Sequence, residues 1–380
     1  MVKTISDGYK GLERMTLTVG IAGEDSEEEC RIVLRPQEAA LLAQQKDIKV
    51  CVERDAGALV GFPNESYAKV GAEIVDETAI WGGCDAVVKF KSPSIHQLSL
   101  CRRGVSVIAK MHAERSLDYI KELLESRVNA YAFEFLTKDG KTFPAMEASS
   151  GLTAYQAFAY GMFYAQNPPI SSFPGKVYGR TPDGNSANVL VIGYGNIGRK
   201  IAELSLAVGC KVSIAHWNDN YSVGSMSCIN VHDSNFRKLV TEADVIFFCL
   251  RISTYDSEAL ITRDMVLTMR PGAVIVDVTA GFGAGCIETS DTVTTLHNPV
   301  RVIENVTHIK IRNFPRPLYS QSVDLMSKTL IQLVLSWCTN LIDADQESWI
   351  RTGMIISGGK IIHPIISKAW EKKDELRSAI

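Results

Sequence analysis

Three basic side chains in the first third of the sequence could together hold and protonate an acidic substrate. Arg31 follows an acidic run, Lys91 ends the run Val-Val-Lys-Phe-Lys, and His112 ends the run Val-Ile-Ala-Lys-Met-His. An arginine fork binds a carboxylate through two hydrogen bonds, a lysine supplies a charge or a base, and a histidine titrates near neutral pH. Such a set suits a 2-oxo acid, because two of the groups could hold its carboxylate and carbonyl oxygen while the third moves a proton during hydride transfer. Taken singly, each residue is more often a surface ion pair, a solvated lysine or a structural histidine.

A second set of residues could hold the phosphates of a dinucleotide. Val-Leu-Val-Ile enters a G-x-G-x-x-G turn at residues 193–198, and a helix-like segment follows. Gly193 permits the tight turn, Gly195 lets the backbone approach a pyrophosphate, and Gly198 lets the helix pack closely on the strand. The start of the helix, with Asn196 and Ile197, offers unpaired N–H groups to the phosphates. The turn therefore predicts a bound dinucleotide.

Other predicted coenzyme contacts lie at later strand ends. About twenty residues past the glycines, His216 stands where Asp or Glu would bind a ribose 2′-hydroxyl, which favours NADP(H) slightly over NAD(H). Asp219 could still reach that hydroxyl. The remaining predicted contacts are Asn218, Leu250, Asp277 and Asn313.

Strand-like and helical segments alternate in the first part of the chain, which argues for a parallel sheet. A helical pattern over 36–45 separates the first two strands. The predicted strands are Leu17–Ala22, Lys49–Glu53, Ala86–Phe90, Val105–Ala109 and Val128–Phe133. Lys91 and His112 follow two of these strands, and the carboxyl ends of parallel strands are where ligands gather.

The rest of the chain predicts a second domain and a return to the first. A long helix over Pro144–Gln166 and a turn-rich passage precede a dinucleotide fold that begins at Asn188, with later strands over 211–215, 245–250 and 273–278. After Pro315 apolar residues recur at helical spacing as core packing, and the last forty residues resemble a helical appendage. We expect two Rossmann-like, doubly wound parallel-sheet domains (α/β) joined by long helices. Residues 1–150 plus 318–380 form a substrate-binding domain, residues 151–317 form the dinucleotide-binding domain, and the active site lies in the cleft between them.

Composition narrows the class of protein. The 380 residues carry a net charge of −3 with 46% hydrophobic residues, so we expect no binding to nucleic acid or to a membrane. Nine scattered cysteines without a C-x-x-C pair indicate reduced thiols in the cytoplasm. No cluster with metal-ligand spacing is found, so no metal is expected. We expect a small-molecule substrate and a homo-oligomer.

Several segments along the chain form an ordered set of motifs: Val-Gly-Ile-Ala-Gly-Glu (19–24), Arg-Ile-Val-Leu-Arg-Pro (31–36), Gly-Phe-Pro-Asn-Glu-Ser-Tyr (61–67), Lys-Phe-Lys-Ser-Pro (89–93), the strand ending at His112, the glycine turn, Pro-Gly-Ala-Val-Ile-Val-Asp (271–277) and Asn-Phe-Pro (313–315). In these segments the chain resembles the alanine dehydrogenase / pyridine nucleotide transhydrogenase superfamily, whose opine-type members include saccharopine dehydrogenase (lysine-forming) and carboxyethylornithine synthase. The stretch 131–140 is nearer to the saccharopine branch.

The resemblance implies roles for the basic trio. Arg31, Lys91 and His112 would line a 2-oxo-acid site, and Lys91 and His112 would act as acid–base groups. The superfamily usually has a second Asp four residues after the one matching Asp277, but this chain has Gly281 there. Simple alanine dehydrogenase activity is therefore in doubt, and Lys91 and His112 would carry the proton chemistry.

The leading hypothesis is an NAD(P)-dependent oxidoreductase that acts on the C–N bond of an amino acid or opine, by reductive condensation of an amine with a 2-oxo acid or the reverse. One alternative is a D-2-hydroxyacid dehydrogenase-like enzyme, for which His308 is a candidate catalytic histidine. That family normally needs an Arg after the strand ending at Asp277, and none follows. The other alternative is a non-catalytic NAD(P)-sensing protein, which Gly281 favours.

Overall fold

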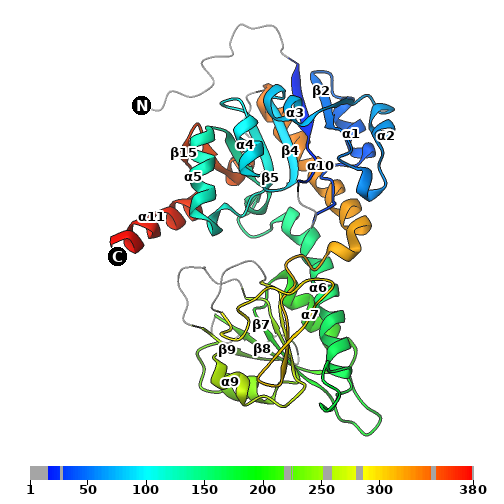
Figure 1. Ribbon diagram of the computed structural model, residues 1–380, viewed down its shortest axis with the longest axis vertical. Coiled ribbons are helices and arrows are strands. Elements are labelled where there is room, and N and C mark those ends of the chain that lie inside the picture. The colour runs from blue at the N-terminus through cyan, green and yellow to red at the C-terminus, as the bar shows by residue number, and fades with distance from the viewer. Residues whose placement is uncertain are drawn as a thin grey trace. The chain divides into compact units, whose positions relative to one another are not determined.

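The computed structural model describes residues 16–25, 29–217, 224, 226–250, 259–279, 286–343 and 348–378. The chain divides into two compact units, Met1–Ser149 with Leu318–Ile380 (unit 1) and Ser150–Pro317 (unit 2). Each unit contains a mostly parallel sheet with helices (Figure 1). This arrangement confirms the predicted α/β fold with two Rossmann-like sheets. The interdomain location of the active site stays a prediction.

The sheet of unit 1 has the order β15-β14-β6-β5-β4-β1-β2-β3. Strands β1 to β6 are parallel, and their order is that of a doubly wound dinucleotide fold, which changes direction between neighbouring β1 and β4. The carboxyl ends of β1 and β4 are therefore where a ligand is expected. The strands are β1 (Leu17–Ile21), β2 (Ile48–Glu53), β3 (Glu73–Val75), β4 (Ala86–Lys91), β5 (Ser106–Lys110), β6 (Asn129–Ala132), β14 (Met354–Ser357) and β15 (Lys360–Ile361).

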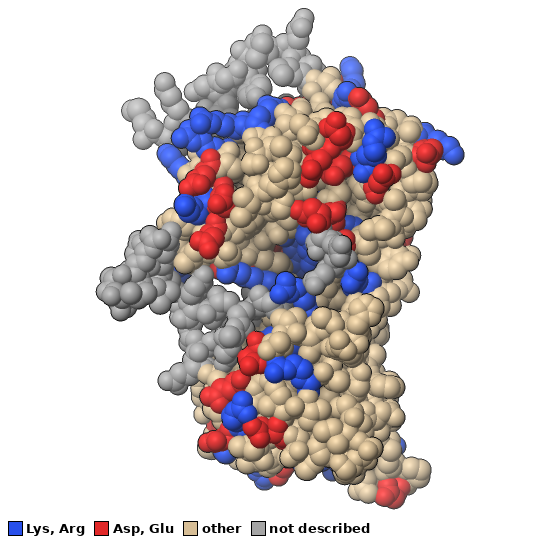
Figure 2. Space-filling view, viewed as in Figure 1, with Lys and Arg blue, Asp and Glu red and all other residues tan. Residues whose placement is uncertain are grey.

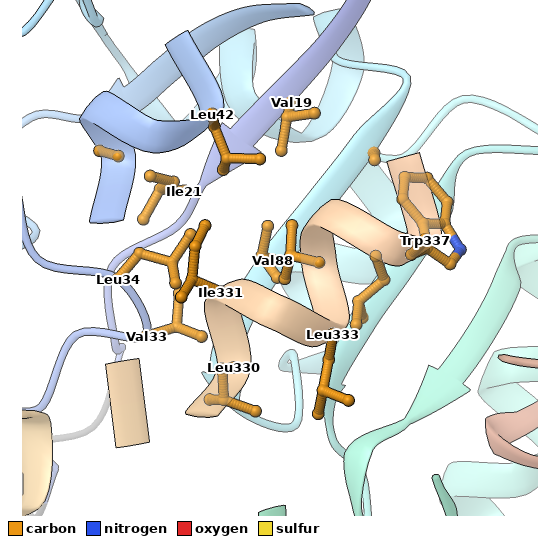
Figure 3. Close-up of a cluster of buried hydrophobic side chains, with 14 of the residues drawn as sticks. Val19, Ile21, Val33, Leu34, Leu42, Val88, Leu330, Ile331, Leu333 and Trp337 are labelled. Atoms are coloured by element: carbon orange, nitrogen blue, oxygen red, sulfur yellow. The ribbon is translucent and has the colours of Figure 1, made fainter. Parts of the chain in front are cut away.

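Helices cover both faces of this sheet. On one face, Val19 and Val88 lie in the same buried cluster as Leu330 and Trp337 of the long helix α10 (Figure 3). On the other face, the Cβ position of Gly20 faces α3. The helices are α1 (Pro36–Ala43), α2 (Asn64–Ala68), α3 (Glu77–Gly83), α4 (Ile95–Leu100), α5 (Leu117–Ser126), α10 (Tyr319–Asp343) and α11 (Pro364–Ser378), with short 3₁₀ helices over Ala58–Val60, Ala113–Arg115, Phe133–Phe135, Arg316–Leu318 and Ser348–Gly353.

The apolar stripe predicted after Pro315 belongs to α10, and it is core packing as predicted. Its members are all buried: Val323, Met326, Leu330, Leu333, Val334 and Trp337. Because the stripe recurs at the 3.6-residue period, one face of the helix packs into the core of unit 1.

The prediction for the last forty residues is wrong. They contain a β-hairpin as well as a helix, and β14 pairs antiparallel with β6 at the edge of the parallel sheet. Ile355 and Ile356 of this strand are fully buried. The end of the chain is thus part of the unit 1 sheet.

The sheet of unit 2 has the order β12-β13-β11-β10-β7-β8-β9, in which β12 alone is antiparallel. One face packs with α6 and α7, and the other carries Phe236 and Val240 of α8 and Val266 of α9. The strands are β7 (Asn188–Ile192), β8 (Lys211–His216), β9 (Ser227–Asn230), β10 (Val245–Phe248), β11 (Val274–Asp277), β12 (Arg301–Ile303) and β13 (Val306–Ile309). The helices are α6 (Pro144–Gln166), in which the boundary between the units falls, α7 (Asn196–Ala207), α8 (Phe236–Glu242) and α9 (Arg263–Leu267).

All nine cysteines lie in the described part of the chain and are free thiols. Among the described residues, no helix has the length and apolar character needed to cross a membrane. Acidic and basic side chains are both present on the visible face of each unit (Figure 2).

Candidate functional site

The carboxyl ends of β1, β4, β5 and β6 in unit 1 carry a cluster of charged side chains. Glu24 follows β1, Lys91 ends β4, Lys110 ends β5, His112 lies two residues further on, and Glu134 follows β6. Parallel strands deliver their last residues to one edge of the sheet, which explains the convergence. We call these residues, together with Glu29, Arg31, Glu114 and Arg115, the charged edge.

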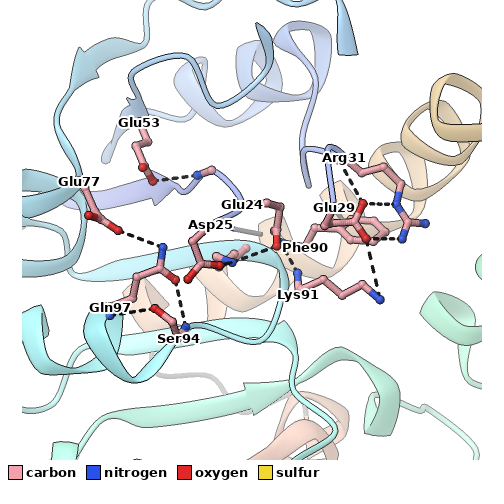
Figure 4. Close-up of polar contacts among 12 residues, drawn as sticks. Glu24, Asp25, Glu29, Arg31, Glu53, Glu77, Phe90, Lys91, Ser94 and Gln97 are labelled. Atoms are coloured by element: carbon pink, nitrogen blue, oxygen red, sulfur yellow. Dashed lines mark hydrogen bonds and ion pairs between the residues drawn. The ribbon is translucent and has the colours of Figure 1, made fainter. Parts of the chain in front are cut away.

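Arg31 is buried, with 3% of its side chain exposed, and it is held from three sides. Its Nε donates to Glu29 Oε1 at 2.6 Å, its Nη2 pairs with Glu29 Oε2 at 2.5 Å, and its Nη1 donates to Ser322 Oγ at 2.9 Å. The guanidinium also lies over the Phe90 ring, 4.3 Å from the ring centre (Figure 4). Burial alone would raise the pKa of Glu29, but the bonds from Arg31 hold that pKa below its ordinary value. The ion pair with the acidic run, which the sequence suggested as the ordinary alternative, therefore exists, but it is buried.

Glu24 organises the end of β4. Its Oε2 accepts a hydrogen bond from the fully buried Lys89 at 2.9 Å, and its Oε1 accepts from the backbone N–H groups of Phe90 and Lys91 at 3.0 and 3.1 Å (Figure 4). Burial raises the pKa of Glu24, and the charge of Lys89 opposes that rise. This carboxylate fixes the backbone from which Lys91 projects.

Lys91 is the most accessible member of the predicted trio. Its side chain is 35% exposed, and its Nζ lies 4.0 Å from Glu29 Oε2 (Figure 4). Burial and then the positive charge of Arg31 lower the pKa of Lys91. A lysine with a lowered pKa is a better proton acceptor near neutral pH.

The backbone at His112 adopts the left-handed conformation, with φ 47° and ψ 35°. This region is uncommon for a residue with a Cβ and is retained where the surroundings enforce it. The carboxylate of Glu134 accepts hydrogen bonds from the backbone N–H groups of Met111 (3.2 Å) and His112. Burial raises the pKa of Glu134. Glu134 thus sets the conformation from which the imidazole projects.

The imidazole of His112 is neutral at physiological pH. Arg115 Nη2 lies 2.9 Å from His112 Nδ1, so the arginine donates and the ring nitrogen accepts. Burial, together with the charges of Lys110 and Arg115, lowers the pKa of His112 to about 3, against an opposing bond to Glu114. Because Nδ1 accepts from Arg115, the ring proton of neutral His112 lies on Nε2, so the imidazole can donate a hydrogen bond to a substrate oxygen, whereas a proton acceptor must come from another group.

This lowered pKa makes stability depend on pH. Because folded His112 binds a proton only near pH 3 and the unfolded residue binds one near 6.5, its contribution to the free energy of unfolding is lost as the pH falls from about 6.5 toward 3. We expect the wild type to lose up to about 1.4 kcal/mol per pH unit more than the variant His112→Gln below pH 6, in urea unfolding series at pH 7, 6 and 5. The exposed His96 provides a control variant, His96→Gln. Parallel pH curves for the wild type and His112→Gln would contradict the assignment.

His112, Glu114 and Glu134 place ligand atoms within 4.8 Å of one another. The sequence did not reveal this grouping, because Glu134 joins His112 and Glu114 from a separate segment after β6. The described contacts favour protein donors over a metal ion, since Arg115 bonds to His112 Nδ1 and two backbone N–H groups bond to Glu134.

The structure brings the predicted trio into one cluster with residues that the sequence did not single out. Lys110 is the clearest addition: burial, then the charges of Lys91, Arg31 and Arg115, lower its pKa to about 7, with Glu134 opposing. The signal available in the sequence was a lysine at the end of a predicted strand, two residues before His112. Such clusters of perturbed groups are typical of functional sites.

In unit 2 the glycine turn has the geometry that its spacing predicts. Gly193 has φ +94°, and a Cβ there would lie 2.6 Å from the backbone N of Leu250. A Cβ on Gly198 would lie 1.9 Å from the carbonyl oxygen of Gly193, so α7 contacts its strand closely. A Cβ on Gly195, by contrast, would meet nothing within 4 Å, and no side chain caps α7 there. The residues thus fit a pyrophosphate at the open helix start.

Two glycine variants separate these roles. Gly195→Ala is expected to weaken NAD(P)H binding at least tenfold while leaving the free energy of unfolding within about 0.5 kcal/mol, because the added methyl occupies space that the protein leaves open. Gly198→Ala is expected to lower both the NAD(P)H affinity and the free energy of unfolding, because the methyl would force α7 away from its strand. Fluorescence titration with NAD(P)H and urea unfolding measure the two effects. Unchanged coenzyme affinity in Gly195→Ala would contradict a phosphate site at this turn.

The other predicted coenzyme residues have varied surroundings. Asn196 is exposed at the start of α7, Ile197 is partly buried beside it, half-buried His216 ends β8, and buried Leu250 follows β10 close to Gly193. Asn218 and also Gly281 lie outside the described residues.

Asp277 is almost fully buried and bonded within the protein. Its Oδ2 pairs with Lys310 Nζ at 3.2 Å and accepts from Ser290 Oγ at 3.1 Å, and its Oδ1 accepts from the backbone N of Thr279 at 2.9 Å. Through the bonds from Thr279, Asp277 caps the loop that follows β11. Asn313 is half-buried, and its backbone carbonyl accepts a hydrogen bond from the backbone N–H of Arg316.

His308 is the candidate catalytic histidine of the D-2-hydroxyacid alternative, and both of its ring nitrogens have hydrogen-bond partners within unit 2. Its Nε2 lies 2.7 Å from Thr289 Oγ1, and its Nδ1 lies 3.0 Å from the carbonyl of Val306. With 3% of the residue exposed, His308 serves packing.

Family models match most of the chain. The family models of the alanine dehydrogenase/PNT N-terminal and C-terminal domains match residues 20–153 and 165–364. Similar curated proteins include an alanine dehydrogenase of Halomonas elongata, 27% identical with 93% of this chain and 97% of the relative covered, and one of Bacillus subtilis, 28% identical with 93% and 94% covered. Among solved structures, an L-alanine dehydrogenase aligns with a TM-score of 0.80 at 20% identity, covering 94% of this chain and 99% of that one. A transhydrogenase from Sinorhizobium meliloti aligns with 0.71 at 20% identity, covering 91% and 99%.

Proposed function

Because the chain belongs to the alanine dehydrogenase/PNT family, we propose that it is an NAD(P)-dependent oxidoreductase acting on the C–N bond of an amino acid or opine. In the reductive direction, an amine condenses with a 2-oxo acid, water leaves, and the resulting imine carbon accepts a hydride. The observation that carries the proposal is the charged edge, where Arg31, Lys91 and His112 meet at the carboxyl ends of neighbouring parallel strands.

The residues of unit 1 have separate roles in substrate binding, proton transfer and positioning. Arg31 and Lys91 supply the positive charge that holds the carboxylate and the carbonyl oxygen of the oxo acid. Lys91, whose pKa is lowered, accepts a proton from the attacking amine and donates one to the departing hydroxyl, and the Nε2–H of neutral His112 donates a hydrogen bond to the carbonyl oxygen. Glu29 and Glu134 position Arg31 and His112 without contacting the substrate themselves.

In unit 2 the glycine turn and the open start of α7 would hold the pyrophosphate of the coenzyme, which supplies the hydride when bound. We further propose that NADP(H) is preferred. This preference is supported by His216, which ends β8 at the place where a carboxylate would repel a 2′-phosphate.

A panel of amine and oxo-acid pairs, followed by the absorbance of NADH and of NADPH, tests the function. Reduction that requires both an amine and a 2-oxo acid, with a higher kcat/KM for NADPH, is the expected result. Reduction of pyruvate without any amine would favour a hydroxyacid dehydrogenase. Tight coenzyme binding with no turnover across the panel would favour a sensing protein. A higher kcat/KM for NADH would overturn the coenzyme preference alone.

A further inference from the structure

The strand β4 contains an irregularity immediately before Lys91. Its register against β5 runs Val88 opposite Ile108 and then Lys91 opposite Lys110, so β4 advances three residues where β5 advances two. A β-bulge of this kind inserts one residue, bends the strand and redirects the side chains that follow it. In a regular ladder Phe90 would stand opposite Lys110. The bulge puts Lys91 there instead.

Two lysines therefore occupy one register position on adjacent strands. Residues that face each other in neighbouring strands project from the same side of the sheet, so the two ammonium groups start from neighbouring backbone positions. Their charges act on each other, which contributes to the lowered pKa of Lys110. Like charges at paired positions destabilise a sheet, so an arrangement that a bulge creates calls for a compensating ligand.

Glu24 and Glu29 act on Lys91, and Glu134 acts on Lys110, through their charges, but in the described part of the chain none of them forms a hydrogen bond with either ammonium group. In the described part of the chain, neither Lys91 Nζ nor Lys110 Nζ has a hydrogen bond, and the nearest carboxylate to Lys91, Glu29, lies 4.0 Å away. The carboxylates of Glu24, Glu29 and Glu134 are bonded to other donors, as described above. A largely buried ammonium without a hydrogen-bonded partner is costly, and an anionic ligand would relieve that cost.

We propose that Lys110, paired with Lys91 by the bulge, binds a second anionic group of the substrate, so that the preferred oxo acid is a 2-oxo dicarboxylic acid. The inference rests on the proposed function. Arg31, Lys91 and His112 suffice for the carboxylate, the carbonyl oxygen and the proton of a simple 2-oxo acid. Lys110 is the additional cation, and a second carboxylate is its chemical complement.

The test compares 2-oxoglutarate with 2-oxopentanoate, which has the same number of carbons but lacks the second carboxylate. Isothermal titration calorimetry on the full chain measures both affinities without requiring turnover. The wild type is expected to bind 2-oxoglutarate at least about tenfold more tightly. Lys110→Met is expected to weaken 2-oxoglutarate binding about 10- to 100-fold and to change 2-oxopentanoate binding by less than about twofold. Lys110→Arg, which keeps the charge, is expected to restore most of the difference.

Lys121→Met is the matched control, because Lys121 is exposed on α5. If circular dichroism shows that Lys110→Met does not fold, the affinities for 2-oxoglutarate and 2-oxopentanoate are compared in Lys110→Gln and Lys110→Arg instead. Equal affinity of the wild type for the two acids, or an equal loss of both in the Lys110 variants, would overturn the inference while the proposed function stands. Failure of both acids to bind, with NADPH still bound, would overturn the 2-oxo-acid function itself.

Discussion

Lys91→Met is expected to lower kcat by about 10³-fold, within the range that general acid–base groups contribute. The substitution removes the ammonium group that would protonate the departing hydroxyl, and it keeps the length of the side chain. NAD(P)H affinity is expected to stay within about twofold, because the glycine turn belongs to the other unit. Steady-state kinetics on the best pair from the panel and fluorescence titration of the coenzyme measure the two quantities.

The control for this variant is Lys49→Met, which removes an exposed lysine from β2 of the same sheet. Lys91→Arg adds a second comparison, since arginine keeps the charge but does not release a proton near neutral pH. An arginine variant that binds the oxo acid but does not turn over would separate binding from proton transfer. Undiminished turnover in Lys91→Met would remove Lys91 from the mechanism.

Glu134→Ala is expected to lower the free energy of unfolding by about 3–5 kcal/mol, because it removes a buried carboxylate and leaves the surrounding donors without an acceptor. The backbone N–H groups of Met111 and His112 would lose their acceptor, and the left-handed backbone of His112 would lose its support. Glu134→Gln keeps a carbonyl acceptor and is expected to lose less than half as much. Urea unfolding at pH 7 measures both.

The matched control is Glu125→Ala, which removes an exposed carboxylate from α5. Surface changes of this type usually stay within about 0.5 kcal/mol. A loss below about 1 kcal/mol in Glu134→Ala would show that the carboxylate does not support this segment. A stable Glu134→Ala protein with unchanged kcat would also remove Glu134 from its positioning role.

The parts of the fold with strong periodicity could be predicted. The runs that became β1, β2, β4 and β5 are rich in branched apolar residues, and α10 has a sustained apolar stripe. The short strands β3, β9 and β12 were missed because none has more than four residues and each contains polar residues. β14 was missed because its four residues become a strand only by pairing with β6, a partner more than two hundred residues earlier.

The site was predictable only in its most recognisable residues. Arg31, Lys91 and His112 follow or end patterned segments, and the structure gathers them at one edge of unit 1. Lys110 was missed because strand alternation alone does not reveal the bulge that pairs it with Lys91. Glu29 and Glu134 act through hydrogen bonds to residues in other elements or to backbone groups, and such bonds have no signature in spacing.

The pairing of β14 with β6 has a consequence for how the protein is made. Unit 2 is a continuous segment, so it can fold as it leaves the ribosome, whereas the core of unit 1 needs α10 and β14, which are synthesised after unit 2. Until β14 is synthesised, β6 is an edge strand without its second partner, the kind of surface that recruits strands from other molecules. Premature termination before Met354 would therefore yield an aggregation-prone product rather than a shortened enzyme.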